Sequence, residues 1–121
     1  IIKALKKAGY KIDDDKKKKP FPIITGQNCE KDNVKLIIDR RQKGSIFKDY
    51  RILAAQTVKT ADDMLNDRDY DINDRRTYWS GSKIIPAYLC EPIIIYKENM
   101  QKELFDLGYY KKSEILKIKN N

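Results

Sequence analysis

The apolar residues of this chain are densest in residues 83–96, where two runs rich in Ile, Leu and Tyr flank a Glu-Pro pair. Short runs of this composition are typical of largely buried strands. Proline cannot donate a ladder hydrogen bond, so the two prolines of the segment favour strand starts, edges or bulges. The pattern predicts two short strands, residues 84–90 and 92–96, or one bent strand, at the buried inner face of a small sheet, with Ile94 inside the core.

In residues 49–65 the apolar residues have the spacing of a helix. Successive helical residues are about 100° apart, and this spacing gathers the apolar residues of the segment on one face: Leu53, Ala54, Thr57, Val58, Ala61, Met64 and Leu65. Polar residues fall opposite: Gln56, Lys59, Asp62 and Asp63. Asp49 precedes the first turn and is a preferred N-cap residue. We predict a main helix over 49–65 whose apolar face packs on the sheet.

The remaining segments predict short elements: a helix over 1–8 that ends at Gly9, strands over 10–12, 23–25 and 34–39, a helix over 99–107 that ends at Gly108, and a tail over 111–121 that forms a docked strand or a short amphipathic helix. The predicted fold class is α+β. It comprises a small mixed or antiparallel sheet packed by one main helix and short terminal helices, with extended basic ends. With 121 residues, the chain is expected to be a single domain, 1–121, with a lysine-rich loop at 13–19 and the tail at 111–121.

The net charge of +8 is concentrated at the two ends of the chain. Residues 1–50 carry +7, residues 51–100 carry −1 and residues 101–121 carry +2. Basic ends on a nearly neutral body favour a polyanion or an acidic protein as a neighbour. However, 20 of the 26 basic residues are Lys, and specific phosphate recognition relies more on Arg. A compositional bias therefore explains the charge equally well.

Two segments are candidate polyanion contacts. The first is a loop that holds two of the six arginines together with a lysine: Arg40, Arg41 and Lys43. A plain polar turn has the same composition, and both interpretations stay open. The second is a run of four lysines: Lys16, Lys17, Lys18 and Lys19. An acidic triplet at 13–15 adjoins this run and cancels much of its field, so a solvated loop is the alternative there.

The sequence contains one aromatic pair outside the apolar run that is a candidate protein contact, formed by Tyr78 and Trp79. Trp79 is the sole tryptophan, and the pair lies in a turn-like stretch rich in Ser and Gly. Amphipathic aromatic side chains in such a setting either pin a loop to its own domain or form a contact patch.

No residue pattern predicts catalysis, a cofactor or a metal site. The chain has no histidine, and two cysteines, Cys29 and Cys90, are too few for a disulfide framework or a four-ligand zinc site. Aspartates alternate in 67–74 as in a calcium loop, but the sixth position is Ile72 instead of Gly and the twelfth is Tyr78 instead of Glu. The apolar run is shorter than the roughly 20 residues of a membrane span. We therefore expect neither an enzyme nor a membrane-spanning protein.

These observations favour a non-enzymatic subunit that assembles into a larger particle, either a phage or viral structure or an organellar nucleoprotein such as a ribosome. Its partners would be neighbouring protein subunits, with nucleic acid at the basic ends. The alternative is a free-standing basic nucleic-acid-binding accessory protein. Because the two cysteines form no framework, the expected location is an intracellular, reducing compartment: the cytoplasm, a virion or an organelle matrix.

Overall fold

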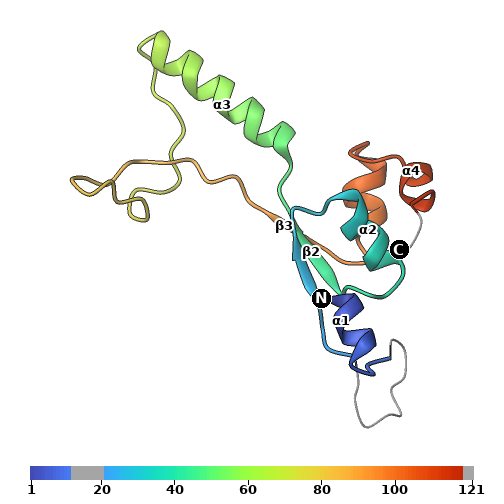
Figure 1. The fold of residues 1–121 in the computed structure, drawn as a ribbon. Helices are drawn as coiled ribbons and strands as arrows, with labels where there is room; N and C mark the ends of the chain where they lie inside the picture. The colour runs from blue at the N-terminus through green and yellow to red at the C-terminus, as the bar shows by residue number, and fades with distance from the viewer. Residues whose placement is uncertain (12–20, 119–121) are drawn as a thin grey trace. The chain divides into compact units, whose positions relative to one another are not determined.

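The computed structural model describes residues 1–11 and 21–118, which divide into two compact units. Unit 1 comprises Ile1–Phe47 and Ile93–Asn121, and unit 2 comprises Lys48–Pro92. Figure 1 shows the elements of both units in chain order. The chain leaves unit 1 at the end of one strand and returns at the start of the next, where Phe47 and Ile93 are paired. The prediction of a single domain stays a prediction.

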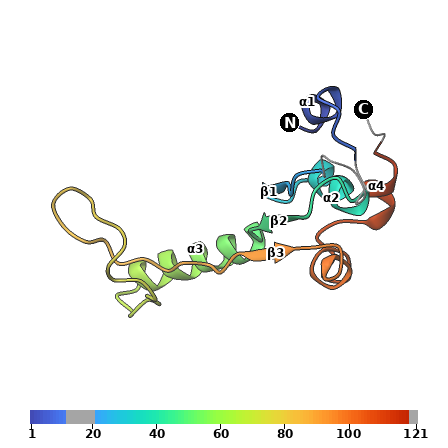
Figure 2. The same ribbon diagram turned by 90° about the horizontal axis from the view of Figure 1, so that it is seen from below.

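Unit 1 contains a three-stranded sheet with the order β1-β2-β3 (Figure 2). Strand β1 (Thr25–Gln27) runs parallel to β2 (Gly44–Phe47), and β3 (Ile93–Ile95) runs antiparallel to β2. Parallel neighbours need a crossover connection, which helix α2 (Lys31–Ile38) supplies. This strand–helix–strand unit is the building block of α/β folds, so the predicted α+β class is wrong.

Helix α2 occupies most of the segment 34–39 that the sequence predicted as a strand. Its buried residues Val34 and Ile37 lie three positions apart, which is one helical turn. The helix begins upstream in a polar stretch at Lys31, so the apolar run contains only its later turns. A short apolar run fits a strand and a buried helix equally well, and here the parallel crossover requires the helix.

Three further short elements complete unit 1: α1 (Ile2–Lys7), the π-helix η1 (Gln101–Asp106) and α4 (Lys112–Leu116). They lie within the predicted helices 1–8 and 99–107 and the predicted tail, which therefore contains a helix. Gly9 and Gly108 follow α1 and η1 with φ of 88° and 67°, the left-handed conformation in which glycine commonly ends a helix. The lysine-rich loop 13–19 lies outside the described residues.

Every buried apolar side chain among the described residues belongs to unit 1: Cys29, Val34, Ile37, Phe47, Ile95, Met100, Leu104 and Ile115. The rings of Phe47 and Tyr109 are nearly perpendicular, with their centroids 4.6 Å apart. The prediction that residues 84–90 form the buried centre is wrong. Ile84 and Ile85, for example, are 42% and 48% exposed. Within unit 2, a cavity of about 360 Å³ separates residues 86–88 from α3, so the two do not form a close-packed core.

Two adjacent residues of β3 differ in burial, and this difference provides a test of the core. Ile95 is fully buried opposite Ser45, whereas Ile94 is 50% exposed opposite Ile46, so the expected burial of Ile94 is wrong. Ile95→Ala should lower the free energy of unfolding by about 2–5 kcal/mol because it leaves a cavity. Ile94→Ala should cost about 1 kcal/mol or less. Urea unfolding of the two variants measures the difference, and equal losses would contradict the burial pattern.

Unit 2 contains one long helix, α3 (Tyr50–Leu65), which confirms the predicted main helix. Its N-cap is Asp49 as predicted, with a carboxylate oxygen accepting from the backbone N–H of Arg51 at 2.9 Å. The apolar face that we expected to be buried is instead exposed, with Val58 at 69% and Met64 at 58%.

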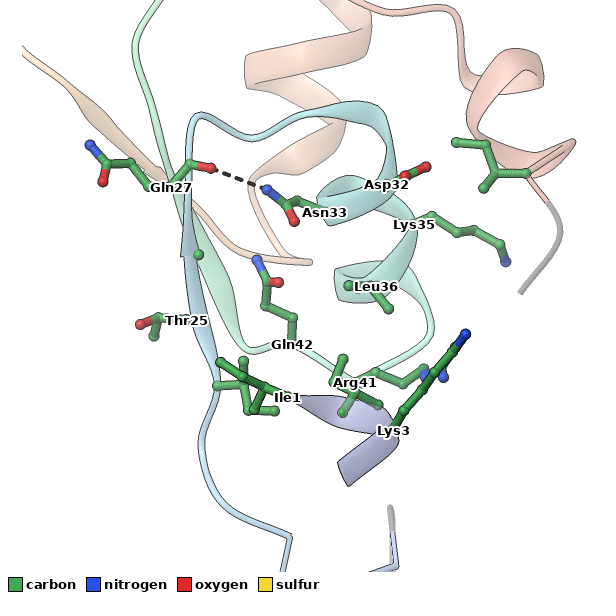
Figure 3. Close-up of a pocket in the computed structure, with 14 residues that line it drawn as sticks. Ile1, Lys3, Thr25, Gln27, Asp32, Asn33, Lys35, Leu36, Arg41 and Gln42 are labelled. Atoms are coloured by element: carbon green, nitrogen blue, oxygen red, sulfur yellow. Dashed lines mark hydrogen bonds between the residues drawn. The ribbon is translucent and has the colours of Figure 1, made fainter. Parts of the chain in front are cut away.

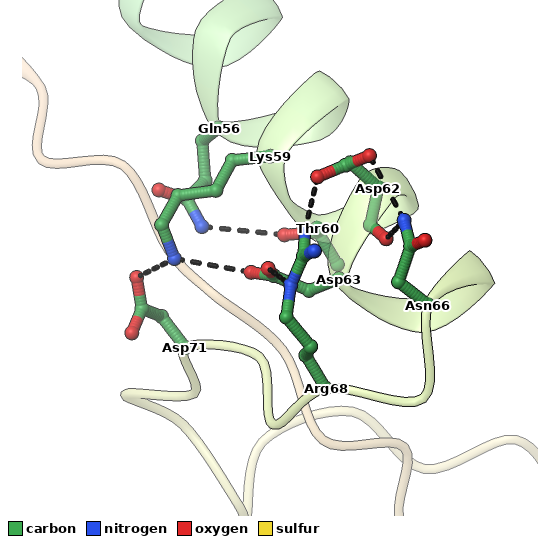
Figure 4. A network of polar contacts seen from close by, with 8 residues as sticks. All are labelled: Gln56, Lys59, Thr60, Asp62, Asp63, Asn66, Arg68 and Asp71. Carbon is green, nitrogen blue, oxygen red and sulfur yellow. Dashed lines mark hydrogen bonds and ion pairs between the residues drawn. The ribbon is translucent and has the colours of Figure 1, made fainter.

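A network of ion pairs closes the C-terminal end of α3 (Figure 4). Lys59 Nζ lies 3.2 Å from Asp63 Oδ2 and 2.9 Å from Asp71 Oδ2. Arg68 Nε lies 3.0 Å from Asp63 Oδ1, and the same guanidinium also pairs with Asp62. Carboxylates at a helix C-terminus face the negative end of the macrodipole, so these cations offset an unfavourable placement.

Acid should loosen this end of α3. The pKa of Asp63 is lowered, first by its hydrogen bond from Arg68 and then by that from Lys59. A carboxylate with a depressed folded-state pKa stabilises the fold above its unfolded pKa of about 3.9, and the contribution is lost as the pH falls through the folded value. NMR shifts of residues 59–66 should therefore become less helical below about pH 4. Asp63→Asn should show this loosening already at neutral pH, whereas the exposed Asp69→Asn should behave like the parent, and identical behaviour of both variants would contradict the role of Asp63.

Candidate functional site

The chain adopts an uncommon conformation immediately after β1. Asn28 and Cys29 have φ of 70° and 51°, in the left-handed region. This region costs residues other than glycine roughly 1–2 kcal/mol, although asparagine visits it more readily than most. Residues held in such conformations cluster at ligand-binding and active sites. Residues 27–30, which we call the β1–α2 loop, are therefore the leading candidate for a functional site.

Two hydrogen bonds fix the β1–α2 loop. The backbone N–H of Cys29 donates to Ser45 Oγ in β2 at 3.1 Å, and both residues are buried. Asn33 Nδ2, in the first turns of α2, donates to the carbonyl oxygen of Gln27 at 3.1 Å (Figure 3). The loop is thus held from the neighbouring strand and from the following helix, while Asn28 between the two anchors stays exposed.

The β1–α2 loop lies at the carboxyl end of a parallel strand. In open α/β sheets, ligands bind outside the carboxyl ends of the strands. The side-chain amide of Asn28 carries both hydrogen-bond donors and an acceptor, so it can bind a hydroxyl group that donates and accepts. The arrangement suits a neutral polar ligand more than an ion.

A pocket of about 710 Å³ lies next to this loop and is lined by residues of α1, β1 and α2 (Figure 3). Gln42 in its wall is 6% exposed and donates from Nε2 to the carbonyl oxygen of Gly44 at 3.1 Å. A Cβ atom on Gly26 would lie 2.5 Å from the same Nε2, so a larger residue there would displace the Gln42 amide. Residues of β1, an edge strand of the described sheet, line one wall of the pocket.

The predicted polyanion residues of the loop after α2 do not share one surface. Arg41 lines the pocket beside β1, and its Nε is buried without a hydrogen-bond partner among the described residues. Arg40 and Lys43 are exposed and lie outside the pocket lining. Lys16, Lys17, Lys18 and Lys19 lie outside the described residues. The polyanion contacts stay a prediction.

The aromatic pair lies in unit 2, within a hairpin-like stretch. Tyr78 and Trp79 are 50% and 64% exposed, and Trp79 forms an isolated bridge with Ile84. The carbonyl oxygen of Tyr78 accepts from the backbone N–H of Ile85 at 2.8 Å. Both rings are accessible to a partner, and their role as a protein contact stays a prediction.

In residues 1–11 and 21–118, no group of three or more Cys, Asp or Glu side chains is arranged to hold a metal ion. Within the same residues, no helix has both the length and the apolar content needed to cross a bilayer.

No protein-family model matches the chain, but individual proteins do. The chain is 37% identical over 115 residues to the multiple sugar-binding periplasmic receptor ChvE of Rhizobium radiobacter. It is also 37% identical over 114 residues to the multiple sugar-binding periplasmic protein SbpA of Azospirillum brasilense. These matches cover 95% and 94% of this chain but 31% and 30% of the two relatives, so the chain spans about a third of their length.

Two solved structures resemble the chain. One is an ABC transporter solute binding protein from Clostridium phytofermentans with bound β-D-glucose, with a TM-score of 0.79, 38% identity, and coverage of 94% of this chain and 33% of that protein. The other is a carbohydrate transporter solute binding protein from Chloroflexus aurantiacus in complex with D-glucose. Its TM-score is 0.68 at 36% identity, with coverage of 76% of this chain and 26% of that protein.

These relatives correct the functional predictions. They are sugar receptors and binding proteins, so the structural subunit of a phage, virus or ribosome and the alternative nucleic-acid-binding accessory protein are both wrong. The expected partners, particle subunits and nucleic acid, are wrong for the same reason. The intracellular, reducing location is also wrong, since relatives including the D-xylose-binding periplasmic protein of Haemophilus influenzae are periplasmic. A small number of cysteines and an excess of lysine did not specify the compartment.

The sequence analysis did not single out Asn28. The signal that could have found it is a polar residue between a strand and a following helix, because that position lies at the carboxyl edge of a parallel sheet. Predicting residues 34–39 as a strand removed this signal, since the loop then joined two strands.

The two cysteines should differ in reactivity. Burial raises the pKa of the Cys29 thiol to about 11, although the hydrogen bond with Ser45 acts in the opposite direction. The thiolate is the reactive form, so at pH 8 iodoacetamide should alkylate the partly exposed Cys90 at least about tenfold faster than Cys29. Mass spectrometry of the peptides measures both rates. Equal rates without denaturant would contradict the burial of Cys29, and Cys29→Ser provides the control for the Cys90 rate.

Proposed function

We propose that this chain forms part of a periplasmic sugar-binding receptor that serves an ABC transporter, and that it binds sugar without catalysing a reaction. The observation that carries the proposal is the likeness, over 94% of the chain at 38% identity, to a solute binding protein with bound β-D-glucose. Two curated relatives of similar identity are named as multiple sugar-binding proteins, which supports the same ligand class.

The β1–α2 loop gives the proposal a residue-level form. Sugar hydroxyls both donate and accept hydrogen bonds, and the Asn28 amide offers both functions at the carboxyl end of β1. The bonds of Cys29 to Ser45 and of Asn33 to Gln27 hold the backbone on either side. Such preorganisation lowers the entropy that ligand binding would otherwise cost. Asn28 is therefore the residue of unit 1 that we assign to sugar contact.

The composition supports binding without catalysis. The chain contains no histidine, the commonest general base near neutral pH. The two cysteines cannot form a nucleophile–histidine pair for the same reason, and the Cys29 thiol is buried in the core of unit 1.

The test uses a chimera in which this chain replaces the matched third of the glucose-binding protein of Clostridium phytofermentans. We expect isothermal titration calorimetry to detect D-glucose binding by the chimera. Asn28→Gly should weaken this binding roughly tenfold or more, since it removes a hydrogen-bonding side chain. Glycine favours the left-handed backbone, so the melting temperature should stay equal or rise. This variant thus separates ligand contact from backbone strain.

Asn66→Gly is the matched control. Asn66 is exposed at the C-cap of α3 in unit 2, and its substitution should leave the sugar affinity unchanged. A folded chimera that binds neither D-glucose nor D-xylose would contradict the proposed function. An unchanged affinity in Asn28→Gly would remove Asn28 from the site.

A further inference from the structure

Residues 78–85 form a small hairpin in unit 2, which we call the aromatic hairpin. Trp79 and Ile84 face each other as an antiparallel bridge, and the backbone N–H of Ile85 donates to the carbonyl oxygen of Tyr78 at 2.8 Å. Successive residues of a strand point to opposite faces. Trp79 and Ile84 therefore occupy one face of the hairpin, and Tyr78 and Ile85 occupy the other.

Large apolar side chains are exposed on both faces of the aromatic hairpin. Trp79 and Ile84 are 64% and 42% exposed, and Tyr78 and Ile85 are 50% and 48% exposed. A protein partner with a flat contact surface covers one face of a two-stranded hairpin and leaves the other in water. A lipid interface surrounds a hairpin tip that enters it, so both faces are covered at once. The two-sided exposure favours a lipid surface over a protein partner.

The turn of the aromatic hairpin satisfies its own polar groups. The backbone N–H and the Oγ of Ser80 both donate to the carbonyl oxygen of Lys83 at 2.9 Å. The backbone N–H of Lys83 donates in turn to Ser80 Oγ at 3.2 Å. Gly81 lies between them with φ of 93°, a conformation that glycine adopts without steric cost. Unpaired backbone groups are costly in lipid, so a turn with this internal bonding suits the outer part of a lipid layer.

Three cations adjoin the exposed aromatic residues: Arg75, Arg76 and Lys83. All three are exposed, and none of them pairs with a carboxylate in the described part of the chain. Residues 75–90 contain these three cations and no Asp or Glu, which gives the segment a charge of +3. Charged side chains are almost never fully buried unless they are paired. The aromatic hairpin therefore stays at the surface of any larger domain that contains it.

Asp74 braces the base of this segment. Its Oδ1 accepts from the backbone N–H of Arg76 at 2.8 Å and from that of Thr77 at 3.1 Å. Asp74 also forms an antiparallel bridge with Ala87, on the other side of the hairpin. The carboxylate is thus engaged with the backbone, and the bridge holds the two strands together next to the arginines.

We propose that the aromatic hairpin, with Arg75 and Arg76 at its base, docks the receptor on a membrane surface of anionic lipids. Trp and Tyr are enriched at membrane interfaces because their amphipathic rings fit the level of the headgroups. Lys and Arg are attracted to anionic headgroups, and each one near the surface adds to the affinity. The inference rests on the proposed function only for the compartment, since the relatives are periplasmic and a membrane bounds that space.

The fluorescence of Trp79 reports on the aromatic hairpin alone, because Trp79 is the sole tryptophan of the chain. Vesicles of equal parts phosphatidylglycerol and phosphatidylcholine should shift the emission of the full chain to shorter wavelengths, since the ring leaves water. Lipids brominated on the upper acyl chain should quench the emission. Vesicles of phosphatidylcholine alone should bind the chain at least about tenfold more weakly, because they lack the anionic charge that attracts the cations.

Two triple substitutions with the same loss of charge give a matched control. The hairpin variant is Arg75→Gln/Arg76→Gln/Lys83→Gln. The control variant is Lys3→Gln/Lys6→Gln/Lys7→Gln, at exposed positions of α1. In vesicle flotation, the hairpin variant should lower the lipid partition coefficient at least about tenfold, and the control variant less than about threefold, because only the first removes cations beside the inserted rings.

Three results would overturn the inference. Equal losses in the two variants would mean that net charge alone explains the binding. An unshifted Trp79 emission on vesicles that bind the chain would mean that the hairpin stays in water. An emission that is already shifted without vesicles, and that depends on the concentration of the chain, would mean that a second copy covers the hairpin.

The sugar titration separates this inference from the proposed function. In the chimera, the hairpin variant should leave the affinity for D-glucose unchanged and lower vesicle flotation by the same factor as in the full chain. A chimera that binds D-glucose without binding the anionic vesicles contradicts the membrane surface alone. A chimera that binds the vesicles through the hairpin but binds no sugar contradicts the proposed function alone.

Discussion

The parallel pairing of β1 with β2 is the constraint on which the arrangement of unit 1 depends. Parallel strands cannot be joined by a tight turn, so the chain crosses over through α2 and buries Val34 and Ile37 as it does so. The same pairing places Gly26 opposite Ser45, which brings the Ser45 hydroxyl within reach of the Cys29 backbone. The exposed Asn28 therefore owes its position to a register set by the two strands.

The core of unit 1 explains how a strained loop can persist. Cys29 itself is fully buried among Phe47, Ile95 and the residues of the C-terminal helices. Residues far apart in sequence also meet at the surface of unit 1, where Lys31 pairs with Glu114 at 2.6 Å. Burial of the Cys29 side chain and its backbone hydrogen bond together offset the cost of two consecutive left-handed residues. These contacts hold the β1–α2 loop in one conformation.

Unit 2 has a different physical basis. Its order within the described residues rests on polar contacts: the Asp49 cap, the ion pairs around Asp63 and the pairing of Asn73 with Leu89. Exposed ion pairs contribute little to stability in water, with a median near 0–1 kcal/mol. The ion pairs around Asp63 therefore order the end of α3 without supplying an apolar core to unit 2.

The sequence by itself determined the features whose signals are local. The period of residues 49–65 and the cap at Asp49 specified α3, and Gly9 and Gly108 ended two short helices as predicted. Only the tertiary structure decided which apolar residues are buried. Ile94 and Ile95 are chemically identical, but they lie on opposite sides of the sheet. Only Ile95, on the side that faces α2 and α4, is buried.

Long-range contacts also explain why the sequence did not reveal Asn28 and why it wrongly placed the core in residues 84–90. Residues 34–39 fit a strand or a helix equally well, and the parallel register of β1 and β2 selected the helix, which in turn placed Asn28 at the edge where ligands bind. Residues 84–90 have the composition of a core, but burial depends on a facing layer that no property of the segment encodes. Composition and periodicity thus determined what needs to be buried, and long-range contacts decided where that burial occurs.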